Sequence, residues 1–212
     1  MPLAGQPMVE WSIAAMRAAH SVRSIVVACP SGHAHDLDGK DLDVVDGGAT
    51  RTQSVSNALA AVETELVAIH DAARPLITPA LLEGVVATLV ADPEADGAMA
   101  ATPVTDTIKR ASPGPGSDLG VSGPPKAAMH VEATVDRRQL WAAQTPQVFR
   151  VEALRQALEA DPAQIEAATD EAMLIEAAGG RVLIHPSAPA NFKVTTPLDL
   201  GLAELLLSAR SL

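Results

Sequence analysis

LVAIHDAARP, at residues 66–75, is the stretch from which the organisation of this chain can be worked out. Its first four residues are apolar, and a short continuous apolar run of this kind predicts a strand that is buried on both faces. Because ligands of open α/β sheets bind at the carboxyl ends of such strands, we expect the chemistry to lie around Asp71. A carboxylate there could hold a divalent cation, and Arg74 could face a phosphate. The motif alone leaves open an alternative, in which Asp71 merely ends the strand and Arg74 lies on the surface.

The composition is that of a soluble globular protein with an excess of acidic residues. Its 212 residues suit one domain, and 48% of them are hydrophobic. We expect a cytoplasmic protein, because no apolar run approaches the roughly 20 residues that span a bilayer and the first residues lack the features of a secretory signal. A net charge of −11 and an aromatic content of 2% argue against a nucleic-acid or membrane partner. A small polyanionic substrate is compatible with this charge if a few basic residues converge.

Strand-like and helix-like segments alternate along most of the chain, which is typical of a doubly wound, mostly parallel sheet. Besides residues 66–69, the sequence predicts strands at Ser24–Ala28, Asp43–Asp46, Gly97–Val104, Gln144–Phe149, Arg181–His185 and Phe192–Val194. The predicted helices are Met8–Ala19, Arg51–Val62, a helix capped by Thr78 that runs to Val90, Val151–Ala160, Asp170–Ala178 with Thr169 as its cap, and a last helix opened by Pro197.

The alternation breaks between residues 105 and about 140. Two extended stretches, Thr107–Ala111 and His130–Val135, flank a segment rich in glycine, proline and serine at Ser112–Pro125. We interpret the region as a two-stranded arm with a flexible tip that projects from the sheet. Two strands are marginally stable alone, so we expect the arm to contact a partner subunit.

Several motifs suit phosphate or nucleotide binding, although each also has an ordinary structural explanation. The glycines in Gly47–Ser54 would let the backbone approach a base, or could form a plain strand–helix turn. Thr105–Arg110 and Thr134–Arg138 combine hydroxyls with cations, as a phosphate site or a solvated basic strand would. Lys193 falls inside a predicted strand, where lysine is uncommon without a partner or an anion. The sequence offers no motif for covalent catalysis, so these features together favour phosphoryl or nucleotidyl transfer.

Six blocks in this order resemble the 2-C-methyl-D-erythritol 4-phosphate cytidylyltransferase family of non-mevalonate isoprenoid synthesis. The resemblance covers nearly the whole chain from Leu3. The blocks are Gly47-Gly48-x-x-Arg51-x-x-Ser54-Val55, His70-Asp71-Ala72-Ala73-Arg74-Pro75, Asp106-Thr107-Ile108-Lys109-Arg110, Gln144-Thr145-Pro146-Gln147, Thr169-Asp170-Glu171 and Asn191-x-Lys193-x-Thr195.

The resemblance implies a Rossmann-like nucleotidyltransferase fold and a reaction in which methylerythritol phosphate attacks the α-phosphorus of CTP, with Mg²⁺ neutralising the triphosphate. It also implies a homodimer in which the arm of one subunit reaches into the other. The implied catalytic residues are Asp71, also the metal-associated carboxylate, and Lys193. The implied substrate-binding residues are Gly48 and Ser54 for cytosine, Ala72 and Arg74, and Thr107, Arg137, Thr169 and Lys193 for methylerythritol phosphate.

The chain departs from the family at its beginning. The family starts with a strand and a glycine-rich loop, followed by an arginine and a lysine, whereas Pro2–Pro7 matches the segment just after them. Because that strand is central in the family fold, we expect a gap between neighbouring strands with unpaired backbone groups. We hypothesise that Met1 is an internal methionine of an N-terminally truncated reading, and we expect little activity and poor folding.

Two other interpretations stay open at this point. The chain could be a cytidylyltransferase for another polyol phosphate, such as ribitol 5-phosphate. It could also be a non-catalytic nucleotide-binding relative.

Overall fold

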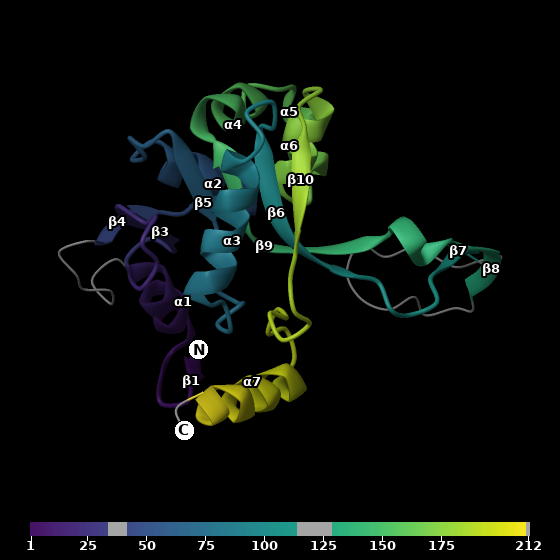
Figure 1. Cartoon of the computed structure of the whole chain (residues 1–212), viewed down its shortest axis with the longest axis horizontal. Coiled ribbons are helices and arrows are strands. Elements are labelled where there is room, and N and C mark those ends of the chain that lie inside the picture. The colour runs from purple at the N-terminus through teal and green to yellow at the C-terminus, as the bar shows by residue number, and fades with distance from the viewer. Residues whose placement is uncertain (34–41, 114–128, 211–212) are drawn as a thin grey trace. The chain divides into compact units, whose positions relative to one another are not determined.

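The computed structural model describes residues 1–33, 42–113 and 129–210, which form two compact units (Figure 1). The main unit comprises Met1–Ala101 and Ala143–Leu212, and the arm unit comprises Thr102–Ala142. The two units are described separately below. The prediction that the chain is one domain from which an arm projects stays a prediction.

The main unit is built from alternating strands and helices, which confirms the predicted α/β class. Its helices are α1 (Met8–Arg17), α2 (Arg51–Leu59), α3 (Pro79–Val90), α4 (Val151–Ala157), α5 (Pro162–Ala167), α6 (Glu171–Ala177) and α7 (Pro197–Arg210). Its strands are β1 (Pro2–Leu3), β2 (Gln6–Pro7), β3 (Ile25–Cys29), β4 (Leu42–Asp46), β5 (Leu66–Ile69), β6 (Gly97–Pro103), β9 (Trp141–Arg150) and β10 (Val182–Pro186), of which β6 and β9 continue into the arm unit.

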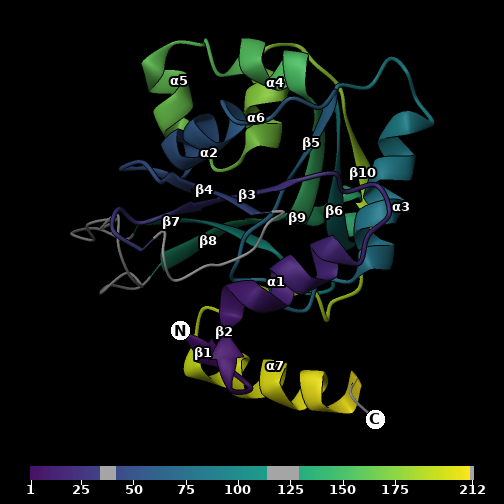
Figure 2. The same ribbon diagram turned by 90° about the vertical axis from the view of Figure 1, so that its left-hand side faces the viewer.

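The strands form separate sheets rather than one. A four-stranded sheet has the order β10-β6-β9-β5, with β10 parallel to β6 and β5 antiparallel to β9. Strands β3 and β4 form a parallel pair of their own (Figure 2). This separation confirms the expected gap between neighbouring strands, and the antiparallel β5–β9 pair makes the sheet mixed.

A cavity of about 740 Å³ lies where the two sheets separate. Consecutive residues of β3 and of β5 line it, and so do Arg51 and Asp71. The prediction that residues 66–69 are buried on both faces is wrong for this reason. All four residues of β5 are only half-buried, because β5 pairs with β9 on one edge and faces the cavity with the other.

Two hydrophobic clusters cover opposite faces of the four-stranded sheet. One contains Val148 with residues of α3, and the other contains Phe149 with residues of α4 and α6. Since successive side chains of a strand point to opposite faces, these neighbours on β9 assign the two clusters to the two sides. A third cluster joins Leu3 to α7. Helices therefore pack on both faces of the sheet. This packing holds the ends of its strands in fixed positions.

Helix caps account for several element boundaries. The Thr78 side chain accepts a hydrogen bond from the Leu81 amide at 3.2 Å, so the predicted start of α3 is confirmed. The cap of α6 is Asp170, which accepts from the Met173 amide at 3.0 Å, and the prediction of Thr169 as cap is wrong. Helix α5 was not predicted.

Two other predicted elements can be compared with the structure. The segment Phe192–Val194 has no strand pairing and is irregular, so the predicted strand there is wrong. The segment Gln144–Gln147 lies inside the long strand β9, as predicted for residues 144–149.

The described part of the arm unit contains two antiparallel strands, as predicted. They are β7 (Lys109–Pro113) and β8 (Met129–Thr134), with a register irregularity after Arg110. A short 3-10 helix follows at Arg137–Gln139. Most of the predicted flexible tip lies outside the described residues. Throughout the described ranges, no helix combines the length and the apolar character that crossing a membrane requires.

Candidate active site

Four charged side chains of alternating sign meet at the end of β5, and we call them the Asp71 network. Asp71 follows β5 directly, and its Oδ1 accepts a hydrogen bond from Arg51 Nε at 3.3 Å. Its Oδ2 accepts from Lys193 Nζ at 3.1 Å. Arg51, the first residue of α2, also donates from Nη1 to both carboxylate oxygens of Glu171 at 2.6 Å. The order of charges is therefore Glu171, Arg51, Asp71, Lys193.

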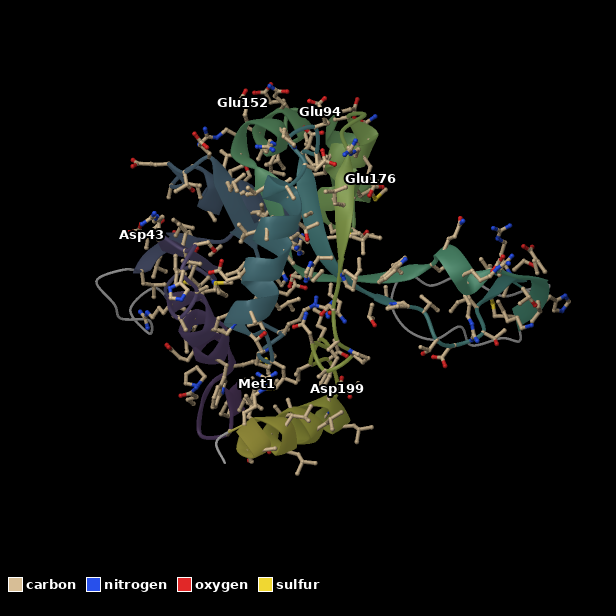
Figure 3. All side chains as sticks on the ribbon, in the orientation of Figure 1. Met1, Asp43, Glu94, Glu152, Glu176 and Asp199 are labelled. Carbon is tan, nitrogen blue, oxygen red and sulfur yellow. The ribbon has the colours of Figure 1, made fainter. Side chains whose placement is uncertain are left out.

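The network is buried at one end and accessible at the other. The Glu171 side chain is 0% exposed and that of Asp71 is 18% exposed, whereas Arg51 and Lys193 are 35% and 45% exposed. Other acidic side chains, such as Glu152 and Glu176, point outward from the main unit (Figure 3). Among the carboxylates that the structure describes, Glu171 is thus unusual, because it is fully buried with one guanidinium as its partner.

The network keeps Asp71 and Arg51 ionised. Burial raises the pKa of Asp71, but the hydrogen bond from Lys193 and the charge of Arg51 outweigh it, so this pKa lies below its usual value. Burial lowers the pKa of Arg51, but Glu171 and Asp71 raise it by more than burial lowers it, so this pKa lies above its usual value. Asp71 is therefore a carboxylate at neutral pH, able to meet a cation.

His70 is part of the scaffold beneath the network. Its Nε2 lies 3.1 Å from the Arg74 carbonyl oxygen, and its Nδ1 lies 3.0 Å from Thr145 Oγ1. Because a carbonyl can only accept, Nε2 carries the proton, and the Thr145 hydroxyl donates to Nδ1. The same hydroxyl oxygen accepts from the Asp71 amide at 3.0 Å. Burial lowers the pKa of His70 to about 4, so the ring is neutral and fixes the turn at Asp71.

Arg74 holds the turn from its other side. It donates to the carbonyl oxygen of Asn191 at 2.9 Å and to that of Ala143 at 3.4 Å. Asn191 is buried and donates to Gln144 Oε1 and to the Thr145 carbonyl oxygen, both at 2.9 Å. The structure therefore places the Arg74 guanidinium against backbone carbonyls. These bonds connect the segment that carries Lys193 to β9 and to the Asp71 turn.

A further buried side chain positions Glu171. Gln147 is 1% exposed and donates from Nε2 to Asp170 Oδ2 at 2.8 Å. Asp170 Oδ1 in turn caps α6. Strand β9 therefore fixes the first turn of α6, where Glu171 lies.

The glycine-rich turn before α2 forms a second small group near the cavity. The Gly48 amide donates to Ser54 Oγ at 3.0 Å, and this hydroxyl donates to the Thr50 carbonyl oxygen at 3.0 Å. A Cβ on Gly48 would lie 2.3 Å from the Gln53 side chain, so glycine lets the turn lie close to the helix. The structure thus brings Gly48 and Ser54 into direct contact, while their binding of a base stays a prediction.

The remaining predicted site residues fall into two groups. Ala72 is exposed beside Asp71, and Thr169 is exposed just before the α6 cap. Thr107 and Arg137 belong to the arm unit, where Thr107 is exposed ahead of β7 and Arg137 donates to the Thr105 carbonyl oxygen. Lys193 lies in an irregular segment, so the predicted position inside a strand is wrong, while its expected partner exists in Asp71.

The side chains around Asp71 suit a metal ion whose ligands are mainly water and phosphate oxygens, with few from the protein. Within the described ranges, no group of three histidine, cysteine or acidic side chains could hold a metal by itself. Mg²⁺ commonly keeps water and phosphate oxygens as ligands and takes only one or two carboxylates from the protein. An ionised Asp71 can supply one such carboxylate, provided that Arg51 or Lys193 releases one of its oxygens.

Sequence reasoning missed Arg51 and Glu171 as members of the site. Arg51 is part of the Gly47 block and Glu171 of the Thr169 block, but each also suits the first turn of a helix. Glu171 in particular lies where the helix dipole favours an acidic residue whether or not it has a role in the site. The signal that could have identified them is their position at the start of a helix next to a motif that already carried chemistry.

Known proteins resemble this chain over nearly its whole length. The family model described as "2-C-methyl-D-erythritol 4-phosphate cytidylyltransferase" matches residues 1–209. The bifunctional enzyme IspD/IspF of Anaeromyxobacter sp. (strain Fw109-5) is 40% identical over 220 residues, which are 99% of this chain and 52% of that protein. The chain therefore spans about half the length of this bifunctional relative.

Single-function relatives are covered more fully. The 2-C-methyl-D-erythritol 4-phosphate cytidylyltransferase of Ralstonia nicotianae is 40% identical over 223 residues, which are 98% of this chain and 83% of that protein. The crystal structure of the Thermus thermophilus enzyme of that name superimposes with a TM-score of 0.79 at 31% identity, covering 98% of this chain and 91% of that chain. This chain therefore belongs to the 2-C-methyl-D-erythritol 4-phosphate cytidylyltransferase family, whose members are nucleotidyltransferases.

Proposed function

We propose that this chain transfers a cytidylyl group from CTP to 2-C-methyl-D-erythritol 4-phosphate. A phosphate oxygen of the acceptor bonds to the α-phosphorus of CTP, the bond from that phosphorus to the β-phosphate oxygen breaks, and pyrophosphate leaves. The observation that carries the proposal is the Asp71 network. It joins four of the six sequence blocks typical of the family through direct contacts.

The network has the properties that phosphoryl transfer needs. Such reactions depend mainly on positioning and on neutralising charge that spreads over phosphate oxygens. Lys193 contacts Asp71 with its ammonium group yet leaves nearly half of its side chain exposed, so it can also face an anion. We assign Lys193 to the stabilisation of charge on the reacting phosphates. We assign Asp71 to a divalent cation, proposed to be Mg²⁺, which supplies further neutralisation when it is bound with CTP.

We carry the substrate-binding roles over from the family blocks. Gly48 and Ser54 bind cytosine, and Ala72 lies beside the nucleotide. Arg74 acts on the nucleotide through the turn that it holds, because its guanidinium is engaged with two carbonyl oxygens. For the acceptor, we propose a pocket made by Thr169 and Lys193 with Thr107 and Arg137, the latter two supplied by the arm of a partner in a homodimer. We place this reaction in the cytoplasm.

We also propose that the 212-residue chain by itself turns over slowly. The cavity between β3 and β5 reaches Arg51 and Asp71, so the elements that position these two side chains lack support on one side. Catalytic groups must be held closely to act, and small displacements cost much of the rate.

The test is a radiolabelled-CTP assay with the purified chain, Mg²⁺ and either methylerythritol phosphate or ribitol 5-phosphate. We expect a slow reaction that needs methylerythritol phosphate and stops with EDTA. Asp71→Asn should lower kcat/KM by about 100-fold, a typical loss for a charged group at a transition state. Asp43→Asn, at an exposed carboxylate on β4, is the control and should not change the rate.

Other results would favour the alternatives. Faster turnover of ribitol 5-phosphate would assign the chain to a different polyol phosphate. The absence of product with both acceptors, together with normal CTP binding, would identify a non-catalytic relative. A kcat in the ordinary range, about 1 s⁻¹ or above, would contradict slow turnover.

A further inference from the structure

Asp71 has a cationic partner on each of its carboxylate oxygens. Oδ1 accepts a hydrogen bond from Arg51 Nε at 3.3 Å, and Oδ2 accepts from Lys193 Nζ at 3.1 Å. A divalent cation and a cationic side chain compete for the same carboxylate, because both use the lone pairs of its oxygens. A metal ion that binds Asp71 must therefore replace one of these two side chains, and their other contacts determine which one.

Arg51 is held firmly in its position. Besides its bond to Asp71, it donates from Nη1 to both carboxylate oxygens of Glu171 at 2.6 Å. Glu171 is fully buried, so withdrawing the guanidinium would leave a buried carboxylate without its partner, which is strongly unfavourable. The backbone of Arg51 is fixed as well, because it is the first residue of α2 and follows the cap Thr50.

Lys193 is held by its ammonium group at a single point. Among the described residues, Asp71 is the one hydrogen-bond and ion-pair partner of this group. The Lys193 side chain is 45% exposed, so an ammonium group that leaves Asp71 can be hydrated, and ion pairs at such exposure contribute little to stability. The flexible lysine stem also allows the group to turn away. Lys193 is therefore the partner that can leave.

The backbone of Lys193 stays beside the Asp71 turn when the ammonium group moves. The Val194 amide donates to the carbonyl oxygen of Ala73 at 2.7 Å, which ties the segment to the turn directly after Lys193. On the other side of Lys193, the carbonyl oxygen of Asn191 accepts from Arg74 at 2.9 Å. The freed ammonium group is thus confined to the reach of one side chain, which keeps it close to any anion bound beside Asp71.

We propose that Lys193 is an exchangeable counter-ion of Asp71, which gives up Oδ2 when a divalent cation binds with CTP, while Arg51 stays on Oδ1. Before the exchange, Lys193 neutralises a mostly buried carboxylate. After it, the ammonium group contacts a phosphate oxygen of the bound substrates, and Arg51 still orients Asp71. The lysine therefore becomes available to phosphate only once the cation is present. This inference rests on the function proposed above.

The first test measures the binding of Mn²⁺ alone to the purified full chain by electron paramagnetic resonance. Lys193→Met should bind Mn²⁺ about fivefold more tightly than the unchanged chain, because it removes a competitor whose ion pair contributes roughly that factor. Lys109→Met, at a lysine of the arm that is bonded to Thr134, is the matched control and should bind as the unchanged chain does. Equal or weaker binding by Lys193→Met would overturn the proposal, as would no binding by either chain.

A double-variant cycle separates competition at Asp71 from a general effect of removing a positive charge. In the Asp71→Asn background the competition no longer exists, so adding Lys193→Met should leave Mn²⁺ binding equally weak or undetectable. A gain of the same size as in the unchanged background would show that Lys193 acts through its charge at a distance. That result would overturn the exchange.

Nitrogen-15 magnetic resonance shows which side chain moves. The sequence contains four lysines, so the Nζ signals are few, and Lys193→Arg identifies the one from Lys193. With Mg²⁺ and α,β-methylene-CTP, which cannot react, the Lys193 Nζ signal should shift and that of Arg51 Nε should not. The opposite pattern would overturn the proposal.

These measurements require no cytidylyl transfer, so they separate the exchange from the proposed function. A chain that shows the exchange but forms no product would contradict the proposed function alone. A chain that forms product while Lys193→Met binds Mn²⁺ no more tightly would contradict the exchange alone.

Discussion

His70 is a buried histidine that is held in its neutral form. Both ring nitrogens are hydrogen bonded, one by the Thr145 hydroxyl and the other to the Arg74 carbonyl oxygen. Protonation would replace the acceptor at Nδ1 by a second donor and would bury a charge. The lowered pKa, about 4, expresses this cost. The residue therefore links the pH of the solution to the stability of the turn that carries Asp71.

We expect stability to fall as the pH is lowered from about 6.5 to about 4. In this window the unfolded chain binds a proton at His70 and the folded chain does not, so protons favour the unfolded state. The difference between the two pKa values corresponds to roughly 3 kcal/mol in the free energy of unfolding. Asp71, whose pKa is also lowered, loses its contribution at more acidic pH, below about 4.

Urea unfolding at a series of pH values measures this dependence. His70→Gln keeps a donor toward the Arg74 carbonyl oxygen but cannot titrate, so the slope of unfolding free energy against pH should become smaller in this window. His20→Gln, at an exposed position, should leave the slope unchanged. Equal slopes for His70→Gln and the unchanged chain would contradict the assignment.

The ion pair between Glu171 and Arg51 is asymmetric, because the carboxylate is fully buried and the guanidinium is 35% exposed. Arg51→Met should therefore destabilise the fold by about 3–5 kcal/mol, since it leaves a buried carboxylate without its partner. Glu171→Gln should cost less, roughly 1–2 kcal/mol, because Arg51 keeps Asp71 as a partner and reaches water. The double variant should be more stable than Arg51→Met alone.

Free energies of unfolding in urea decide this order. Glu176→Gln, at an exposed position on the same helix, is the matched control and should change stability by less than about 0.5 kcal/mol. The reverse order, with Glu171→Gln costing more than Arg51→Met, would show that Arg51 and not Glu171 depends on the pair.

At the scale of elements, the sequence correctly predicted those helices and strands whose formation depends on residues close together in the chain. The four apolar residues before His70 form β5 as predicted, and the Thr78-Pro79 pair begins α3 as predicted. Both signals are complete within a few residues of sequence. The Asp71 turn could also be located, because the end of a strand in an α/β fold is where ligands bind.

Elements that depend on distant contacts could not be predicted. Thr169 and Asp170 are both suitable caps, and the choice of Asp170 accompanies its bond to Gln147, 23 residues away. Lys193 pairs with Asp71, which lies 122 residues away in the sequence. The segment around Lys193 is not part of any strand. The Arg51–Glu171 contact spans 120 residues. A single sequence carries no sign of such pairings, so the site was predicted as separate motifs and not as one network.

At the scale of the whole molecule, the two-stranded arm raises the question of what supports it. Strands β7 and β8 are mostly exposed, and Val131 in β8 is 64% exposed. Two strands without a covered face are marginally stable, so the arm needs a partner surface. We propose that this surface belongs to a second copy, and we expect the chain to sediment as a dimer at micromolar concentration.

Replacing residues 105–140 by a short glycine–serine linker should convert the dimer to a monomer and leave the Tm of the main unit nearly unchanged. The hydrophobic clusters of that unit contain none of the described residues of the replaced segment, 105–113 and 129–140, so we expect its core to form without the arm. Val131→Asp should weaken the dimer, because it places a charge on the strand that we propose to contact the partner. Val90→Asp, at a 60% exposed position in α3, is the matched control and should not change sedimentation. A monomeric unchanged chain, or a linker variant that still dimerises, would show that the arm is not the dimer contact.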